Sequence, residues 1–269
     1  MSTATADRIT WEDLRESARG VVHLRRWAAA IRHPRRALAG VVGDGPLYPL
    51  LILFGLNAVD ELDRTGFGIL LPEVRDAFGM SNTGILTLVG ATALGALVLQ
   101  LPIAVAADRG NRVVIALAGA SMWAGFSLLT GAATAVWMLI VARAGSGIGR
   151  AVVDPTHNAL LSDHYAVGRR PAVFSFHRGA NVLGQFLGPL LAGFLAYTFS
   201  WRAPFFVFAV PTVVLVLLGL RLRDPVRGAQ ERRAAGAEEE VAQTEEPMPS
   251  FAESWRLLWK VEVLRRIWY

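Results

Sequence analysis

The chain has 269 residues, of which 53% are hydrophobic and 18% are charged, and it contains no cysteine. The lack of cysteine excludes disulfide frameworks, thiolate metal sites and thiol nucleophiles. Long uncharged runs carry most of the hydrophobicity, which is typical of a polytopic membrane protein rather than of one or two soluble domains. The net charge of +5 comes almost entirely from arginine.

Residues 1–47 form a basic tail with eight arginines. Thr10 followed by Asp13 resembles a helix-start box, and Pro34 is expected to end the helix that begins there. Apolar residues recur between them at roughly helical spacing, at Trp11, Leu14, Ala18, Val21, Ala28 and Ile31. We therefore expect an amphipathic helix that lies on the membrane surface.

Six membrane-spanning helices are expected over residues 48–222, because a ~30 Å hydrocarbon core needs about 20 residues per helix. The uncharged run Val113–Ala142 is too long for one span, and small residues at Thr130–Thr134 divide it. The expected helices cover about Tyr48–Leu71, Thr83–Ala107, Val113–Leu129, Ala135–Leu161, Ala172–Phe199 and Ala203–Leu220. The predicted fold class is an all-α, six-helix membrane bundle.

Arginines in the loops predict the orientation of this bundle. One side holds the tail arginines together with Arg109, Arg112, Arg169, Arg170, Arg178, Arg221 and Arg223. The opposite side has only Arg75 and Arg202. The positive-inside rule then places both termini in the cytoplasm, and we expect a multi-pass protein of the bacterial plasma membrane.

Residues 223–269 are expected to form a cytoplasmic linker. The part over 224–249 is rich in Ala, Glu and Pro without an apolar period, and it is predicted to be flexible. Ser250 and Glu253 form a second capping-box pattern, which predicts a short surface helix that includes Trp255 and Trp259. The chain then ends where a seventh span could begin.

The first expected span is unusual because Asp60, Glu61, Asp63 and Arg64 lie inside it. A charge at the centre of a membrane helix costs at least ~2.5–3.5 kcal/mol on insertion scales. Such residues therefore usually face a partner or a watery cavity. Four of them in one span predict a polar path through the membrane.

Helical spacing places Asn57, Asp60, Arg64 and Phe67 on one face of this helix, with Asp63 beside them. Asn57 and Phe67 are predicted to line a substrate cavity. A proton-coupling role is predicted for the charged residues of the span. Which of its three carboxylates takes up the proton is left open by the sequence.

The fourth expected span also carries charges, with Arg143, Gly147, Arg150 and Asp154 at i, i+4, i+7 and i+11. This spacing puts them on one helix face. Asp63 and Arg143 lie at the same depth, about 12 Å from their helix ends on the same side at 1.5 Å per residue. Asn57 and Arg150 match at about 21–23 Å. The sequence therefore predicts a buried carboxylate–arginine network, either functional or purely structural, between these two helices.

The loop between the second and third spans contains Asp108, Arg109 and Arg112. The aspartate can accept hydrogen bonds from helix N-terminal amides, and the arginines can bridge neighbouring helix ends. Elsewhere, His157 and His177 could relay protons or serve as hydrogen-bonded packing residues.

The fifth expected span has small residues four apart at Gly184 and Gly188, followed by Pro189 and Gly193. Small residues allow neighbouring backbones to approach closely, and a proline removes one helix hydrogen bond. We expect this stretch, together with Gly147 and Gly149, to serve helix packing.

Three stretches resemble signatures of the major facilitator superfamily. Asp108–Arg112 is similar to its helix 2–3 motif, Arg143–Gly149 to its helix 4 motif and Gly184–Gly193 to its helix 5 antiporter motif. The resemblance covers about residues 48–223. The sequence departs from the motifs at Ala104, Asn111 and Ala192, where the family has glycines.

The resemblance implies a secondary active transporter of a small or amphiphilic molecule, coupled to protons and acting in export or antiport. It implies twelve helices in two halves, each made of inverted three-helix repeats. This chain would then be the N-terminal half, the C-terminal half being a missing partner in the same gene or a separate chain. The loop residues Asp108, Arg109 and Arg112 would form a gating loop. No cofactor, metal or nucleic-acid partner is expected.

Within the superfamily, Asp63-Arg64 and the D-R-x-N-R loop are similar to Spinster-type transporters. This similarity implies a role in proton coupling for Asp63 and Arg64, and it suggests lysolipids or other amphiphiles as substrates. Arg150, however, stands where that subgroup often has a glutamate.

Two other classes of function remain as alternatives. A non-transporting membrane scaffold or receptor would need the same helices but no coupling. A polytopic membrane enzyme is not expected, because the sequence has no H-E-x-x-H pattern, nucleophile elbow or metal cluster. The sequence also has no G-x-x-x-x-G-K-[ST] loop that would indicate an ATP-driven pump.

Overall fold

The computed structural model describes residues 34–244 together with Glu253, Arg256, Trp259 and Lys260. The chain separates into two units, Met1–Asp44 and Gly45–Tyr269. The described part of the first unit contains helix α3 (Pro34–Val42). A proline suits this first position because its fixed backbone angle matches a helical turn. The surface helix predicted before Pro34 lies outside the described residues.

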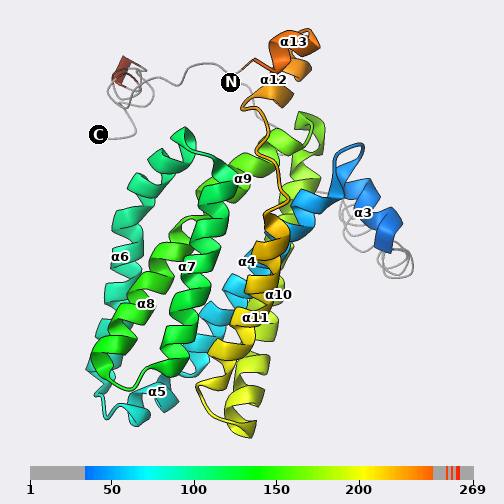
Figure 1. Cartoon of the computed structure of the whole chain (residues 1–269). Helices are drawn as coiled ribbons and strands as arrows, with labels where there is room; N and C mark the ends of the chain where they lie inside the picture. Colours follow the sequence, from blue (N-terminus) through cyan, green and yellow to red (C-terminus); the bar gives the residue numbers. More distant parts are fainter. Residues whose placement is uncertain (1–33, 245–252, 254–255, 257–258, 261–269) are drawn as a thin grey trace, which may run out of the picture. The chain divides into compact units, whose positions relative to one another are not determined.

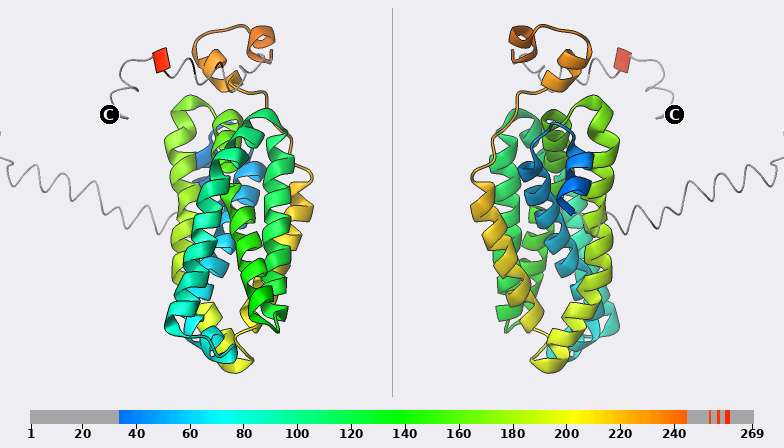
Figure 2. Two further views of the ribbon diagram at one scale, coloured as in Figure 1. Left: turned by 90° about the vertical axis from the view of Figure 1, so that its left-hand side faces the viewer. Right: turned by 90° about the vertical axis from the view of Figure 1, so that its right-hand side faces the viewer.

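The second unit is a bundle of α-helices, and the described residues contain no strand, which confirms the predicted fold class. Its main helices are α4 (Leu47–Ile69), α5 (Leu71–Ala77), α6 (Asn82–Arg109), α7 (Arg112–Ala132), α8 (Val136–Ala151), α9 (Val153–His164), α10 (Arg170–Thr198) and α11 (Ala203–Gly219). The long helices run side by side, with the short α5 at one end of the bundle (Figure 1, Figure 2).

Four helical segments of the described chain are long and apolar enough by themselves to cross a membrane, namely α6, α7, α8 with α9, and α10. Helix α11 is apolar but has 17 residues. In α4, the charged residues between Asp60 and Arg64 interrupt the apolar run. With α4 and α11 included, the structure has a helix for each of the six predicted spans.

The helices pack as two equivalent three-helix repeats would. The first repeat contains α4, α6 and α7, and the second contains α8 with α9, α10 and α11. The first helix of each repeat packs on the second helix of the other, α4 on α10 and α8 on α6. The third helices, α7 and α11, pack on each other. This exchange of partners agrees with the predicted inverted repeats.

The fourth predicted span, expected as one helix as far as Leu161, is divided into α8 and α9 at Val152. Pro155 has no backbone N–H, so the carbonyl of Ala151 lacks its usual helical donor. The N–H of Val152 bonds to the carbonyl of Gly149 at 3.4 Å, a tighter turn than the α-helix. The fourth predicted span is thus one helical segment, Val136–His164, with a one-residue interruption at Val152.

The predicted flexible linker is also corrected over 224–244. This segment contains the short helices α12 (Ala229–Ala234) and α13 (Glu239–Ala242). Gly228 precedes α12 with φ +67°, a conformation that glycine adopts without steric cost. Of the predicted surface helix after Ser250, only Glu253, Arg256, Trp259 and Lys260 are described, and all four are helical.

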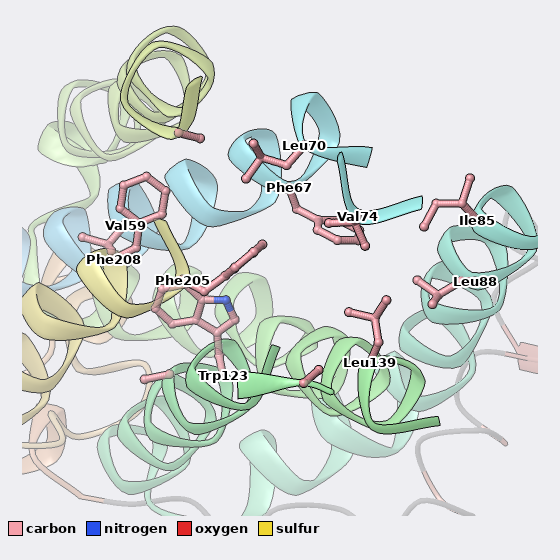
Figure 3. Close-up of a cluster of buried hydrophobic side chains, with 13 residues drawn as sticks. Val59, Phe67, Leu70, Val74, Ile85, Leu88, Trp123, Leu139, Phe205 and Phe208 are labelled. Carbon is pink, nitrogen blue, oxygen red and sulfur yellow. The ribbon is translucent and has the colours of Figure 1, made fainter. Parts of the chain in front are cut away.

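The apolar core of the bundle is built from residues of α4, α5, α6, α7, α8, α10 and α11 (Figure 3). Phe67 of α4 faces Phe205 of α11, with ring centroids 6.1 Å apart. Trp123 of α7 and Leu139 of α8 are buried in the same cluster. This core holds the charged face of α4 against α8.

Candidate functional site

A buried ion pair joins α4 to α8. The side chain of Asp63 is completely buried, and Nη1 of Arg143 donates to its Oδ2 at 3.2 Å. The hydroxyl of Ser127 on α7 donates to Oδ1 of the same carboxylate at 2.7 Å. The Arg143 guanidinium also stacks over the Phe67 ring, 4.0 Å from its centroid. Its Nε atom has no hydrogen-bond partner among the described residues.

One turn away, a second ion pair joins the same two helices. Nε of Arg150 donates to both carboxylate oxygens of Asp60, at 2.9 and 3.0 Å. Nη2 of Arg150 lies 4.0 Å from the Asp63 carboxylate and donates to the Asp60 carbonyl at 3.2 Å. We call Asp60, Asp63, Arg143 and Arg150 the pocket network. Its two acids and two bases balance in charge, as burial away from water requires.

The network is the carboxylate–arginine contact between two helices that the sequence predicts, with one difference in partners. Asp63 pairs with Arg143, as depth matching indicates. Arg150 pairs with Asp60, whereas Asn57 donates to Oδ1 of Asn181 on α10 at 2.7 Å. Asn57 therefore bridges α4 to α10 instead of meeting Arg150.

The remaining charges of α4 form a separate pair. Arg64 donates to Glu61 one turn earlier, and Gln185 of α10 donates to Oε1 of Glu61 at 3.0 Å. The Glu61 side chain is 5% exposed, whereas that of Arg64 is 47% exposed. The positive charge of Arg64 therefore lies at the surface of the site, whereas its partner Glu61 is buried and held by the hydrogen bond from Gln185 of α10.

A pocket of about 380 Å³ lies between α4, α6 and α8. Its lining consists of Arg64, Phe67, Gly68, Leu71, Val89, Thr92, Ala93, Ala96, Arg143, Gly147 and Arg150. A second pocket of about 280 Å³ shares Ala93, Ala96, Gly147 and Arg150 with the first and extends past Gln100 to Asp154. Of the two residues predicted to line a substrate cavity, Phe67 lines the first pocket. Asn57 lines neither.

The residues that α6 contributes to these pockets could not be predicted from the positions of charged residues in the sequence. Thr92 and Gln100 are uncharged, and the apolar pattern of α6 has no strong face that would single them out. Ser127 and Gln185, which bond to the α4 carboxylates, are likewise single polar residues within apolar helices. Only the contact partners supplied by the fold identify them.

Asp154, near the start of α9, lines the second pocket but belongs to a different ion pair. Its carboxylate lies 3.0 Å from Nη2 of Arg178 on α10, and both side chains are about half exposed. Four residues separate Asp154 from Arg150, about 6 Å along the helix at 1.5 Å per residue. It therefore lies beyond the pocket network that the sequence predicts it to join.

A second charged cluster lies at the end of the bundle that carries the linker. Arg112 donates from its backbone N–H and from Nε to Asp224, at 2.7 and 2.9 Å, and from Nη2 to the carbonyl of Pro225 at 2.5 Å. Its Nη1 pairs with Asp163 at the end of α9, and the N–H of Gly228 donates to the same carboxylate at 3.0 Å. We call Arg112, Asp163 and Asp224 the linker clamp.

The other two residues of the predicted gating loop, Asp108 and Arg109, are exposed.

Further along the linker, a hydrogen bond from Arg170 lowers the pKa of Glu231. A hydrogen bond from Arg233 lowers the pKa of Glu239 to about 2. Because Arg170 begins α10, its 2.7 Å pair with Glu231 fixes α12 to the bundle.

The glycines predicted for packing differ in how strongly they are needed. A Cβ at Gly184 would lie 2.5 Å from Cβ of Glu61, and one at Gly188 would lie 2.8 Å from the carbonyl oxygen of Leu62. Gly149 is equally tight against α7. Gly147 has its nearest neighbour at 3.2 Å and Gly193 at 3.8 Å, so these two have more space. Pro189 lies inside α10, directly after the tight contact.

Comparisons with known proteins agree with this architecture. The family model of the Major Facilitator Superfamily matches residues 53–269. The chain is 26% identical over 215 residues to the "Probable L-galactonate transporter" of Escherichia coli (strain K12), covering 78% of this chain and 47% of that protein. It is 33% identical over 177 residues to the lincomycin resistance protein of Streptomyces lincolnensis, covering 64% of this chain and 36% of that protein.

Among solved structures, a bacterial homolog of the human lysosomal transporter Spinster, inward-facing and unoccupied, matches with a TM-score of 0.58 and 22% identity. The match covers 76% of this chain and 45% of that one. A POT family transporter in complex with 5-aminolevulinic acid matches with a TM-score of 0.59 and 15% identity, over 81% and 44% of the two chains. Such identities show a shared fold.

The chain spans about half or less of the length of these relatives. They are transporters or resistance proteins, in agreement with the prediction of a protein that is not an enzyme. The family match, the packing of the two three-helix repeats and the charged residues in the first and fourth spans all indicate the same family. The chain belongs to the Major Facilitator Superfamily.

Proposed function

We propose that this chain forms one six-helix wall of a proton-coupled secondary transporter, with its substrate bound in the pocket between α4, α6 and α8. The observation that carries the proposal is the pocket network, since Arg143 and Arg150 both pair with buried carboxylates and line that pocket. Ionisable groups inside membrane helices usually mark a transport pathway or a proton relay. A purely structural pair would have no need to border a cavity.

The geometry offers a simple route to coupling. A buried carboxylate that loses its guanidinium partner is more stable as the neutral acid, so it takes up a proton. Arg143 makes a single hydrogen bond to Asp63, and the Arg150 side chain is 25% exposed toward the pocket. An anionic substrate that draws either guanidinium away would therefore load a proton onto Asp63 or Asp60. Substrate release would reverse the exchange.

The pocket lining favours a small molecule that has an anionic group beside an apolar part. Arg64, Arg143 and Arg150 all reach the lining, and Phe67 and Leu71 supply apolar surface. Two of the relatives are named for sugar acids, a galactonate transporter and a hexuronate transporter. Others are named for multidrug resistance, which fits transport outward, as does the antiporter-like pattern at Gly184–Gly193. The partner exchange described above binds substrate and proton together and therefore describes cotransport; outward antiport would instead require that substrate binding displace the proton.

The second wall of the transporter is a further six-helix half, since the family fold has two such halves. The excess of loop arginines on one side supports a further part of the proposal, that the linker clamp and both ends of this chain lie on the cytoplasmic face of a bacterial plasma membrane.

The test is transport by the assembled transporter in proteoliposomes, with L-galactonate as the first substrate. Asp63→Asn keeps the size of the side chain but cannot exchange a proton at neutral pH. We expect it to abolish accumulation driven by a pH gradient while substrate exchange between equal pH values continues. Asp76→Asn, at an exposed position of the short helix α5, is the matched control. Unchanged gradient-driven transport by Asp63→Asn would remove this carboxylate from the mechanism.

A further inference from the structure

Two histidines lie buried between the pocket network and the end of the bundle that carries the linker clamp. His157 of α9 is 2% exposed and His177 of α10 is 1% exposed. Nδ1 of His157 lies 3.2 Å from Nε2 of His177, a hydrogen bond between two imidazoles. The rings meet edge to face with centroids 5.4 Å apart. Neutral imidazole both donates and accepts, so such a pair can pass a proton along.

A small cavity connects this pair to the pocket network. Its volume is about 10 Å³, and Asp60, Trp123, Arg150 and His157 are among its lining residues. A cavity of about this size with several polar partners can hold a single water molecule. The indole Nε1 of Trp123 has no hydrogen-bond partner among the described residues, so it is a free donor for such a water.

On the far side of the pair, His177 lies beside the backbone of Leu53 on α4. Nδ1 of His177 is buried and has no hydrogen-bond partner among the described residues. His177 is the eighth residue of α10 and His157 the fifth of α9. The charged and polar groups around the pair are Asp60 and Asn57 on α4, Arg150 on α8, Asp154 on α9, and Arg178 and Asn181 on α10.

We propose that His157 and His177 form a proton relay between Asp60 and the side of the membrane on which the linker clamp lies. The inference rests on the proposed proton coupling and names the route that protons take. A proton bound at Nδ1 of His177 displaces the proton on its Nε2 toward Nδ1 of His157. His157 then releases a proton from its Nε2 through the cavity water to Asp60. Each imidazole gains one proton and loses one, so both return to the neutral form.

A relay affects the rate at which Asp60 is protonated, whereas a purely structural packing role of the two histidines would not. It predicts that protons reach Asp60 faster than they would across an apolar barrier, with no change in how many finally bind. The test is a stopped-flow pH jump on the assembled transporter in lipid nanodiscs, followed by infrared detection of the carboxylic acid C=O stretch. No substrate is needed.

The variants His157→Gln and His177→Gln keep a hydrogen-bonding side chain but cannot relay a proton. We expect each to slow protonation of the carboxylates by ~10-fold or more, with the final amplitude unchanged. The matched control is His164→Gln, because His164 lies on the same helix and bonds to the backbone carbonyl of Leu160 instead. Its rate should equal that of the wild type.

Equal rates in the wild type and both relay variants would overturn the relay and leave the proposed function standing. A wild-type protein without any pH-dependent carboxyl band would overturn both. If neither variant folds, hydrogen exchange of the imidazole N–H groups in the unaltered protein decides, observed by nitrogen-15 NMR. Exchange within seconds supports a water-connected relay, and protection for hours means a dry packing pair.

Discussion

The pocket network and the linker clamp are both buried arginine–carboxylate clusters, but their arginines differ in how many of their N–H groups are hydrogen-bonded. In the linker clamp, Arg112 donates from its backbone N–H, Nε, Nη1 and Nη2, all to carboxylates or a carbonyl. In the pocket network, Arg143 gives one hydrogen bond to Asp63 and leaves Nε without a partner among the described residues. In the linker clamp, the hydrogen bonds of the arginine are satisfied within the chain. In the pocket network, the arginines line a pocket.

This difference separates a structural role from a functional one more clearly than burial or charge does. A fully bonded buried ion pair has no alternative arrangement of similar energy, so it holds its elements in place. An incompletely bonded one beside a cavity can exchange its partner for a substrate or a proton. We infer that the linker clamp fixes the end of α9 to the linker, whereas the pocket network changes during transport.

A large loss of stability is expected when the linker clamp is broken. Arg112→Ala would leave Asp163 and Asp224 without their cation, and breaking a buried pair in this way costs about 3–5 kcal/mol. Thermal unfolding in detergent measures the loss. Arg112→Lys should recover only part of it, because an ammonium cannot make the forked contacts of a guanidinium. Wild-type stability of Arg112→Ala would mean that the clamp does not hold the bundle.

The pocket network should respond differently when both partners are replaced. Arg143→Met alone strands the Asp63 carboxylate and is expected to cost about 3–5 kcal/mol. Adding Asp63→Leu removes the stranded charge, and apolar replacements of buried pairs are often neutral or stabilising. The double variant should therefore unfold close to the wild type and yet show no proton-driven transport. Proton-driven transport by the stable double variant would show that the pocket network is structural, like the linker clamp.

A smaller effect, of either sign, is expected along α10. Gly184→Ala should destabilise by about 1–3 kcal/mol, because the new methyl group meets Glu61 of α4 and overpacks the interface. Gly193→Ala is the matched control, since its nearest neighbour is 3.8 Å away. There the substitution should stabilise by about 0.5–1 kcal/mol, because glycine weakens a helix interior. Equal effects at both positions would mean that close approach of α4 and α10 is not required.

The smallest effect concerns the linker. Arg233 lowers the pKa of Glu239 to about 2, so the folded state holds this carboxylate charged more firmly than an unfolded chain does. Stability from the pair is therefore complete above the ordinary glutamate pKa near 4.3. It declines as the pH falls from there toward 2. The protection of the α13 amides against hydrogen exchange, corrected for the intrinsic exchange rate at each pH, should fall over this range in the wild type, and Glu239→Gln should remove this change in protection.

The sequence predicts the polar centre of this protein better than its ends. Equal depth in two helices is enough to pair Asp63 with Arg143, because the rise of an α-helix is constant and the membrane aligns the two ends. The same argument cannot choose between Asn57 and Asp60 as the partner of Arg150. They lie within one turn of each other, and an arginine side chain reaches either.

Residues that act through tertiary contacts are beyond such reasoning. Thr92, Ser127 and Gln185 gain their places at the site only when α6, α7 and α10 pack around α4. The ordered start of the linker is missed for a similar reason. Its composition resembles a disordered segment, and the contacts of Asp224 with Arg112 come from a helix more than 100 residues earlier in the chain.

Infrared difference spectroscopy tests the account most directly, because it observes carboxyl protonation without requiring vectorial transport. The assembled transporter in nanodiscs is titrated with L-galactonate at constant pH. We predict that a carboxylic acid C=O band appears on binding, is lost or shifted in Asp63→Asn or Asp60→Asn, and persists in Asp224→Asn of the linker clamp. A band that is unchanged in both pocket variants, or that disappears only in the clamp variant, would contradict it.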